Sequence, residues 1–158
     1  MGKRELTKRG DFVIKLADKL VKELRHYCRR IKIAGSIRRK EKNPKDIDIV
    51  LIPKNKNKLE EFMRKKGRFV QGGGKEATFR IKGVKIELYY TVPEEWGATL
   101  LAYSSEAGAG IGLRMIAKKK GFKLSQHGLF KGNRRIVGKS EEEIYKALGR
   151  SWKPAEER

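Results

Sequence analysis

The sequence predicts an α+β protein in two parts, a strand-rich first part over residues 1–92 and a small α/β part over residues 93–158. Three observations carry this prediction. Short segments of the first part alternate apolar and polar residues, which is typical of strands. Residues 11–29 instead repeat their apolar positions every three or four residues, which indicates an amphipathic helix. Beyond Pro93 the pattern becomes mainly helical, so the boundary is expected there.

The elements of the first part are expected in the following order. In the helix at 11–29, Cys28 falls on the apolar face and is interpreted as a core residue rather than a reactive thiol. A short strand at 31–34 ends at Gly35. Further along, we expect a strand at 47–52, a helix at 59–66, a tight turn at 71–74, and a hairpin of strands at 77–81 and 84–91.

The second part is expected to begin with a helix at 94–102. A glycine-rich stretch at 106–112 then leads into a further helix, which is followed by a small hairpin at 123–137. Ser140, with Glu143 three residues later, is a capping signature that predicts the start of a last helix.

The charge of the chain is strongly positive. Its 158 residues carry a formal net charge of +21, from 40 Lys and Arg against 19 Asp and Glu. Such a surplus repels itself, and a polyanionic partner is the usual reason for it. The excess lies in two acid-poor blocks, 1–45 and 107–139, which favours a nucleic-acid track over a lysine-rich solvated surface of the kind thermophiles carry. No apolar run approaches the roughly 20 residues of a spanning helix, so no membrane partner is expected.

Cysteine usage bears on the compartment. The chain contains one cysteine, which rules out an internal disulfide and fits a reducing compartment. No signal peptide is recognised at the start of the sequence. We therefore expect an intracellular protein, in the cytoplasm of a prokaryote or of a virus-infected cell.

Three carboxylates stand in strand segments where charges are unexpected. Asp46 and Asp48 are two residues apart, so on a strand they point to the same side and repel each other. A pair of Mg²⁺ ions would relieve this repulsion, because magnesium prefers oxygen ligands. The alternative is an edge-strand pair in which each carboxylate is solvated separately. Glu87 lies in an apolar strand, where an unpaired charge is unfavourable, so a metal or an arginine partner is expected.

A candidate phosphate site precedes the aspartates. Gly35 and Ser36 end a predicted strand eleven residues before Asp46, where bare backbone N–H groups can bind an anion. The Ser36 hydroxyl adds a donor, and Arg38 and Arg39 add charged groups suited to phosphate. A phosphate site beside a carboxylate pair describes a site for nucleoside triphosphates.

These motifs resemble the family X DNA polymerases, the group that contains DNA polymerase beta. The pattern G-S-x-R-R followed by D-x-D is matched in GSIRRKEKNPKDID, and the resemblance continues through VQGGGKEATFRIKGVKIELYY, PEEWGATLLAYSS, LRMIAKKKGFKLSQHGLF and SEEEIYKALGRSWKPAEER. It implies a nucleotidyltransferase palm, a mixed sheet with flanking helices, followed by a C-terminal nucleotide-selection subdomain. The lyase domain and helix-hairpin-helix segments of larger members have no counterpart, so the chain resembles a minimal polymerase.

The resemblance also implies roles for individual residues. Asp46, Asp48 and Glu87 are expected to hold two Mg²⁺ ions, which Mn²⁺ can replace, while Ser36 and Arg39 bind the triphosphate. The other residues expected at the nucleotide are Gly35, Arg38, Tyr103, Ser104 and Gly110. Those expected at DNA are Lys85, Arg114, Lys118, Lys119 and Lys120. The implied activity is template-directed addition of deoxynucleotides to a primer 3′-hydroxyl, on primer-template or gapped DNA. We expect a monomer that fills short gaps in DNA repair.

Three positions depart from the family pattern. Glu87 replaces the usual aspartate, the aromatic-T-G-S segment reads AYSS at 102–105, and Gly110 stands where the family has an asparagine that contacts the incoming base. The glycines at 106–112 either allow close approach of the base pair or leave the segment partly disordered without substrate. Because Gly110 offers no side chain, we expect an error-prone enzyme.

Two other functions remain open at this point. One is a nucleotidyltransferase that extends nucleic-acid ends without a template, and the other is a DNA-binding module whose catalytic site has decayed. Decay would usually remove the D-x-D motif first, and this motif is intact.

Overall fold

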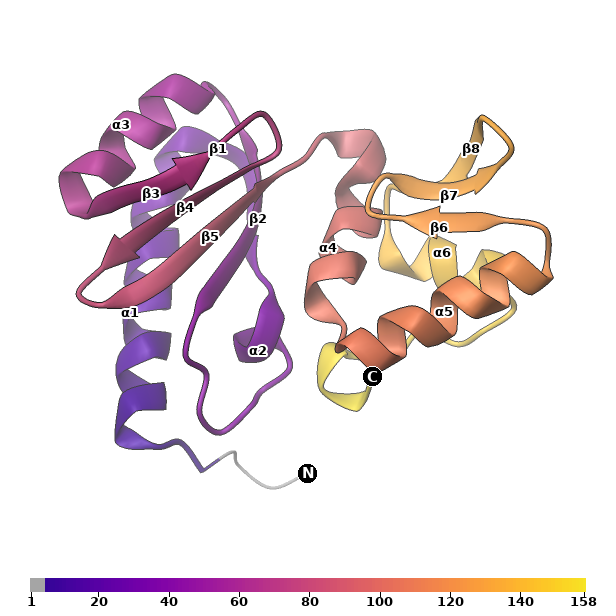
Figure 1. Cartoon of the computed structure of the whole chain (residues 1–158), viewed down its shortest axis with the longest axis horizontal. Helices are drawn as coiled ribbons and strands as arrows, with labels where there is room; N and C mark the ends of the chain where they lie inside the picture. Colours follow the sequence, from indigo (N-terminus) through magenta and orange to yellow (C-terminus); the bar gives the residue numbers. More distant parts are fainter. Residues whose placement is uncertain (1–4) are drawn as a thin grey trace. The chain divides into compact units, whose positions relative to one another are not determined.

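The structure, a computed structural model, describes residues 5–158 and divides the chain into two compact units (Figure 1). Unit 1 extends up to Tyr90, and unit 2 runs from Thr91 to Arg158. The sequence pattern changes close to this point, at Pro93. No described helix is both long and apolar enough to cross a membrane.

Unit 1 is built on a five-stranded mixed sheet. Its strands are β1 (Cys28–Ile33), β2 (Ile47–Pro53), β3 (Arg68–Gly72), β4 (Glu76–Ile81) and β5 (Val84–Tyr90), in the spatial order β1-β2-β5-β4-β3. β2 and β5 run parallel, and the other neighbours are antiparallel. The predicted α+β class with a mixed sheet is therefore confirmed.

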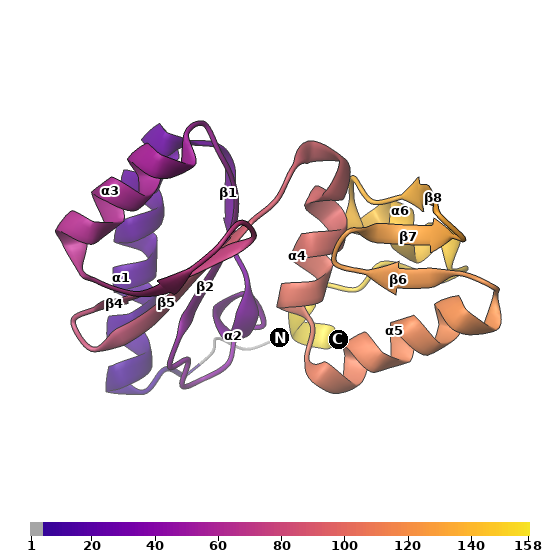
Figure 2. The same ribbon diagram turned by 45° about the horizontal axis from the view of Figure 1, so that its top comes forward.

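Two long helices lie on one side of this sheet, as Figures 1 and 2 show together. They are α1 (Lys8–Leu24) and α3 (Lys56–Lys66). The side chains of Thr7 and Asn55 cap them by accepting hydrogen bonds from backbone N–H groups of the first turn. A 3-10 turn, η1 (Arg25–Tyr27), follows α1, and a short helix, α2 (Gly35–Arg38), follows β1.

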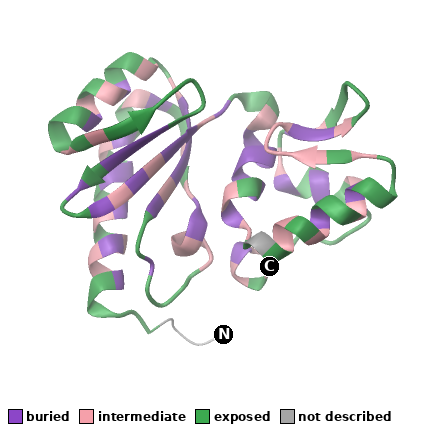
Figure 3. Cartoon of the chain, in the orientation of Figure 1, coloured by how far each residue is buried: buried purple, intermediate pink, exposed green. Residues whose placement is uncertain are grey.

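The core of unit 1 lies between these helices and the sheet. Ile47, Ile49 and Leu51 of β2 are completely buried in one cluster with Val13 and Leu24 of α1 (Figure 3). Strand side chains alternate between the two faces. The face of β2 that carries Asp48 therefore points away from the helices.

The predicted end of the first helix is wrong. The helix stops at Leu24 rather than at residue 29, and Cys28 belongs to β1, not to a helix face. Pairing of β1 with β2 overrides the helical pattern here, and Tyr27 stacks on Phe62 of α3 with ring centroids 5.0 Å apart. The interpretation of Cys28 as a core residue is confirmed, because it is buried, and burial raises the pKa of its thiol to about 11.

The sequence also misses β3 and the first turn of α3. β3 is a mostly exposed edge strand without apolar alternation, so it gives no strand signal. It is held by Phe69, whose ring meets Phe79 of β4 edge-on at 5.5 Å and lies under the guanidinium of Arg64 at 4.1 Å. α3 begins earlier than predicted because Asn55 caps it.

Unit 2 packs helices on a small sheet. A 3-10 turn, η2 (Pro93–Glu95), leads into α4 (Trp96–Ser104), and α5 (Ala107–Lys119) includes the glycine-rich stretch. The strands β6 (Lys123–Ser125), β7 (Gly128–Lys131) and β8 (Arg134–Val137) form a three-stranded antiparallel sheet where the sequence predicts a simple hairpin. α6 (Glu141–Ala147) begins as predicted at Ser140, whose hydroxyl accepts a 3.1 Å hydrogen bond from the Glu143 N–H. A 3-10 turn, η3 (Ala155–Glu157), follows.

A buried ion pair fastens the last segment of unit 2. The guanidinium of Arg158 donates hydrogen bonds of 2.9 and 3.0 Å to the Glu141 carboxylate, and the indole of Trp152 donates to the same carboxylate at 3.2 Å. The Arg158 and Glu141 side chains are 1% and 4% exposed. The segment after α6 is thereby held against the start of that helix.

Candidate active site

The parallel pairing of β2 with β5 brings two of the predicted carboxylates together. In this register Asp48 of β2 lies directly beside Glu87 of β5. Their neighbours Ile47, Ile49, Ile86 and Leu88 are buried in the core with α1 and α3, so Asp48 and Glu87 lie on the opposite face of the sheet. Asp46 lies just before β2 begins and is exposed, and its charge acts on Asp48.

Tyr89 and Lys85 surround Glu87 on this face. The Tyr89 hydroxyl lies 3.2 Å from Asp48 Oδ1 and also donates to Glu87 Oε2. The ammonium of Lys85 pairs with Glu87 Oε1 at 2.7 Å. The sequence predicts a metal or an arginine beside Glu87 and places Lys85 at DNA, whereas in this structure the Lys85 ammonium is the positive group bound to Glu87. Tyr89 is not among the predicted residues, although its period-two spacing from Glu87 is a signal that could have identified it.

The ionisation of the cluster follows from burial and from these contacts. Burial raises the pKa of Asp48 to about 6, and the charges of Glu87 and Asp46 act in the same direction against the Tyr89 hydrogen bond and Arg39. Burial also acts to raise the pKa of Glu87, but hydrogen bonds from Lys85 and Tyr89 outweigh it and leave that pKa below its ordinary value. Burial and the adjacent carboxylates raise the pKa of Tyr89, so its hydroxyl stays protonated and acts as a donor.

The predicted phosphate loop lies against Asp48. Gly35 has a φ of +61°, which favours glycine, and a Cβ at this position would overlap the Asp48 carboxylate. The backbone N–H of Ala34 donates to the Asp48 carbonyl at 2.8 Å, and that of Arg39 donates to the Gly35 carbonyl at 3.1 Å. The loop and the aspartate are therefore adjacent, and Ser36 follows in the first turn of α2, half-buried.

The two arginines of the loop follow at the end of α2. Arg39 contacts the Glu41 carboxylate through Nη2 at 2.7 Å and Nε at 3.0 Å. Its guanidinium is thus bound by an acidic side chain that is not among the residues predicted from the sequence. Arg38 is half-buried in the preceding position. A triphosphate bound by Arg39 would have to compete with Glu41.

The carboxylates fit a divalent cation in chemistry but are not assembled around one. Asp46, Asp48 and Glu87 offer the oxygen donors that Mg²⁺ prefers, and the raised pKa of Asp48 reflects a crowding of negative charge that a cation would relieve. Among residues 5–158, however, no three His, Cys, Asp or Glu side chains converge to hold a metal ion. In this structure, Tyr89 and Lys85 instead donate hydrogen bonds to the carboxylate oxygens that would have to bind a cation.

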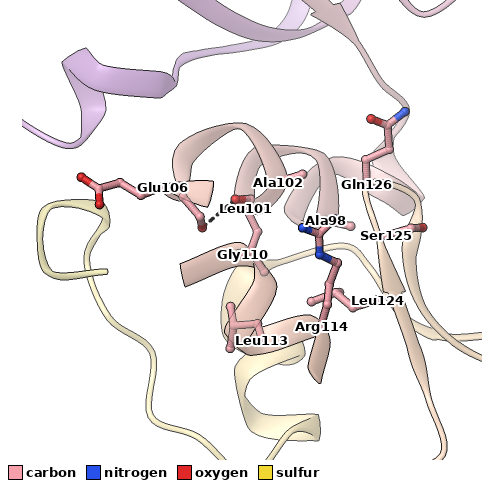
Figure 4. A pocket seen from close by; sticks show the side chains of 11 residues that line it. Ala98, Leu101, Ala102, Glu106, Gly110, Leu113, Arg114, Leu124, Ser125 and Gln126 are labelled. Atoms are coloured by element: carbon pink, nitrogen blue, oxygen red, sulfur yellow. Dashed lines mark hydrogen bonds between the residues drawn. The ribbon is translucent and has the colours of Figure 1, made fainter. Parts of the chain in front are cut away.

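The residues of unit 2 expected at the nucleotide do not all reach one site. Gly110 and Arg114 of α5 line a cavity of about 130 Å³ with side chains of α4, of β6 and of Gln126, which follows β6 (Figure 4). Tyr103 donates from its hydroxyl to Gln126 Oε1 at 2.5 Å. Ser104 is completely buried, so its hydroxyl is not accessible to a nucleotide, and the contact expected from the sequence does not fit this structure.

The last turn of α5 and its C-cap residue, Lys120, carry most of the basic residues expected at DNA. Lys118, Lys119 and Lys120 are all exposed, as is Arg114 one turn earlier. The stretch 107–139 contains no acid in its sequence, so these exposed cations have no acidic neighbour from within that stretch. Such a surface suits the phosphate backbone of a nucleic acid.

A mixed sheet with paired acidic residues beside a Gly-Ser loop, followed by a small α/β unit, is the arrangement that the sequence resemblance leads us to expect of a nucleotidyltransferase. A family model described as DNA polymerase beta thumb matches residues 110–158. The chain is 31% identical over 133 residues to the repair DNA polymerase X of African swine fever virus, Badajoz strain, and this match covers 77% of this chain and 76% of the relative. It is 30% identical over 142 residues to the repair DNA polymerase X of the Pig/Kenya isolate, with 82% of each chain covered. The chain therefore belongs to the family X DNA polymerases, and it is a DNA-directed DNA polymerase.

Proposed function

We propose that this polymerase adds deoxynucleotides to a primer 3′-hydroxyl by two-metal-ion nucleotidyl transfer, and that it fills short gaps in DNA repair as an intracellular monomer. The observation that carries the proposal is the pairing of Asp48 with Glu87 in adjacent parallel strands, directly beside the Gly35 loop. Relatives named as repair polymerases support the repair role. In this proposal, unit 1 is the palm and unit 2 selects the nucleotide.

Asp46, Asp48 and Glu87 would hold the cations, which we propose to be Mg²⁺ with Mn²⁺ as a substitute. Cations bound there would supply the charge that lowers the pKa of a primer hydroxyl and stabilises a leaving pyrophosphate. Glu87 is ionised at neutral pH because Lys85 and Tyr89 lower its pKa. Because the pKa of Asp48 is raised only to about 6, its carboxyl group is mainly ionised at neutral pH, as is that of Glu87.

The chain's own donors would orient the triphosphate. Ser36 offers its hydroxyl at the start of α2, and Arg39 offers a charged fork once it leaves Glu41. Gly35 permits the close approach of this loop to Asp48, so the triphosphate would lie next to the carboxylates. Arg38, Tyr103 and the cavity beside Gly110 are the further proposed contacts of the nucleotide.

In this proposal, basic side chains hold the DNA. The proposed contacts in unit 2 are Arg114 and the three lysines at 118–120, which are all exposed. Lys85 is retained as a proposed DNA contact only after it leaves Glu87, with which it is paired here.

Primer extension with Mg²⁺ or Mn²⁺ on gapped, recessed and single-stranded DNA tests the proposal. We expect template-dictated products, most efficiently on short gaps. Asp46→Asn should reduce turnover at least a hundredfold, as loss of a metal ligand normally does, while DNA binding is retained. Asp18→Asn, which removes an exposed carboxylate of α1, is the control of equal charge change. Untemplated tails would favour the template-independent alternative, and an Asp46→Asn enzyme with near-normal turnover would exclude the metal assignment.

A further inference from the structure

Tyr89 joins the two carboxylates that the register of β2 and β5 brings together. Its hydroxyl lies within hydrogen-bond distance of Asp48 Oδ1 at 3.2 Å and contacts Glu87 Oε2 as well. Tyr89 is 8% exposed, so its ring is fixed by packing and the hydroxyl cannot swing freely into solvent. One phenolic proton thus serves two acidic side chains from neighbouring strands.

Lys85 extends this arrangement on the other side of Glu87. Its ammonium binds Glu87 Oε1, the oxygen that Tyr89 does not use. Residues 85, 87 and 89 alternate along one strand, so they share a face, and the register adds Asp48 to the same row. Along this row, Lys85 and Tyr89 donate hydrogen bonds to carboxylate oxygens of Glu87 and Asp48.

We propose that Tyr89 is a positioning residue that holds Asp48 and Glu87 together in the metal-free enzyme and competes with a divalent cation for their oxygens. This inference rests on the proposed role of Asp48 and Glu87 as metal ligands. A cation that binds both carboxylates must displace the Tyr89 hydroxyl from at least one of them. Tyr89 therefore weakens cation binding to the free enzyme and keeps the two acidic groups in place until a cation arrives.

The matched pair of variants is Tyr89→Phe and Tyr90→Phe. Each removes one phenolic hydroxyl that is bonded to a carboxylate, but Tyr90 points to the helix side of the sheet and donates to Glu60 Oε2 of α3 at 2.5 Å. The probe is Mn²⁺ alone, added to the full chain without DNA or nucleotide. Electron paramagnetic resonance of free Mn²⁺ then measures the dissociation constant.

We expect Tyr89→Phe to bind Mn²⁺ about tenfold more tightly than the wild type, which corresponds to about 1.4 kcal/mol and is in the range of one hydrogen bond to a charged group. Tyr90→Phe should bind Mn²⁺ as the wild type does. Thermal unfolding gives a second readout. Loss of a merely structural contact would lower the melting temperature equally in EDTA and in Mn²⁺, whereas the proposal requires a larger Mn²⁺-induced rise in Tyr89→Phe.

Asp48→Asn separates failure of this inference from failure of the proposed function. If Asp48→Asn binds Mn²⁺ as tightly as the wild type, the metal assignment itself is wrong. If Asp48→Asn loses Mn²⁺ binding but Tyr89→Phe binds equally or more weakly than the wild type, the metal site stands and the competition by Tyr89 is overturned. Tighter binding by Tyr89→Phe alone supports the inference.

Discussion

Replacing Asp48 by asparagine is expected to stabilise unit 1 in the absence of metal while abolishing nucleotide addition. Burial, together with the charges of Glu87 and Asp46, raises the pKa of Asp48 from 3.8 to about 6. Between about pH 4 and about pH 6 the folded protein therefore keeps a proton that the unfolded chain has released. Above this window the ionised carboxylate lowers the free energy of unfolding, and an uncharged asparagine removes that effect.

The magnitude follows from the two pKa values of Asp48. The difference between 3.8 and about 6, at about 1.4 kcal/mol for each pH unit, gives about 3 kcal/mol as an upper limit. Because the folded pKa lies above the unfolded one, the contribution of this group to stability is greatest below about pH 4 and falls as the pH rises through about 6. The advantage of Asp48→Asn should therefore be absent near pH 4 and complete above pH 7.

Amide hydrogen exchange of β2 and β5 in EDTA measures the free energy of opening unit 1. Both tryptophans, Trp96 and Trp152, lie in unit 2, so their fluorescence follows that unit separately and should not change. Asp18→Asn is the control with the same change of net charge at an exposed position. A variant that is no more stable than the wild type at pH 7.5, or whose advantage persists near pH 4, would refute the reasoning.

Three further outcomes are expected. Gly110→Asn should raise the ratio of kcat/KM for matched over mismatched nucleotides about tenfold, since a Cβ there meets nothing within 4 Å; wild-type selectivity equal to that of members with the asparagine would contradict this. Changing the lysines at 118–120 to Glu should flatten the salt dependence of DNA affinity, whose log–log slope is about −4 to −5 if about five phosphates are neutralised; a nearly salt-independent wild type would exclude this account. Glu141→Gln should lower the free energy of unfolding of unit 2, because it leaves the buried Arg158 without a charged partner; complete removal of one partner of a buried pair typically costs about 3–5 kcal/mol. Tryptophan fluorescence during denaturation measures the change, and an unchanged midpoint would show that the ion pair contributes little.

The parts of the fold that the sequence predicts are those in which local pattern and tertiary packing agree. β2 and the β4–β5 hairpin carry alternating apolar residues, and the turn at Lys82 and Gly83 has the positive φ values that its sequence suggests. The end of α1 could not be predicted, because residues after Leu24 continue the helical spacing while β1 gains its hydrogen bonds from β2. Such pairing depends on residues distant in the sequence.

The candidate site likewise has features that the sequence predicts and features that depend on tertiary pairing. The spacing of Asp46 and Asp48 and the Gly-Ser motif are local, so both are visible in the sequence. The contacts of Glu87 depend on which strand lies next to β5 and on which face is solvated, and these are properties of the whole sheet. The contacts of Tyr89 and Glu41 therefore emerge only from the structure, although the spacing of Tyr89 from Glu87 already places the two on one face of β5.

The parallel register of β2 and β5 also makes the placement of Asp48 beside Glu87 independent of the length of the chain between them. Asp48 and Glu87 are placed by backbone hydrogen bonds between two adjacent strands, while the chain between them makes a long excursion through α3, β3 and β4. That excursion turns at Gly73 and Gly74, which are exposed and where added side chains would meet nothing within 4 Å. A fluorescent label or an affinity tag inserted at this turn would lengthen the excursion without changing the strand pairing. The turn is therefore the natural attachment point for following this polymerase on single DNA molecules.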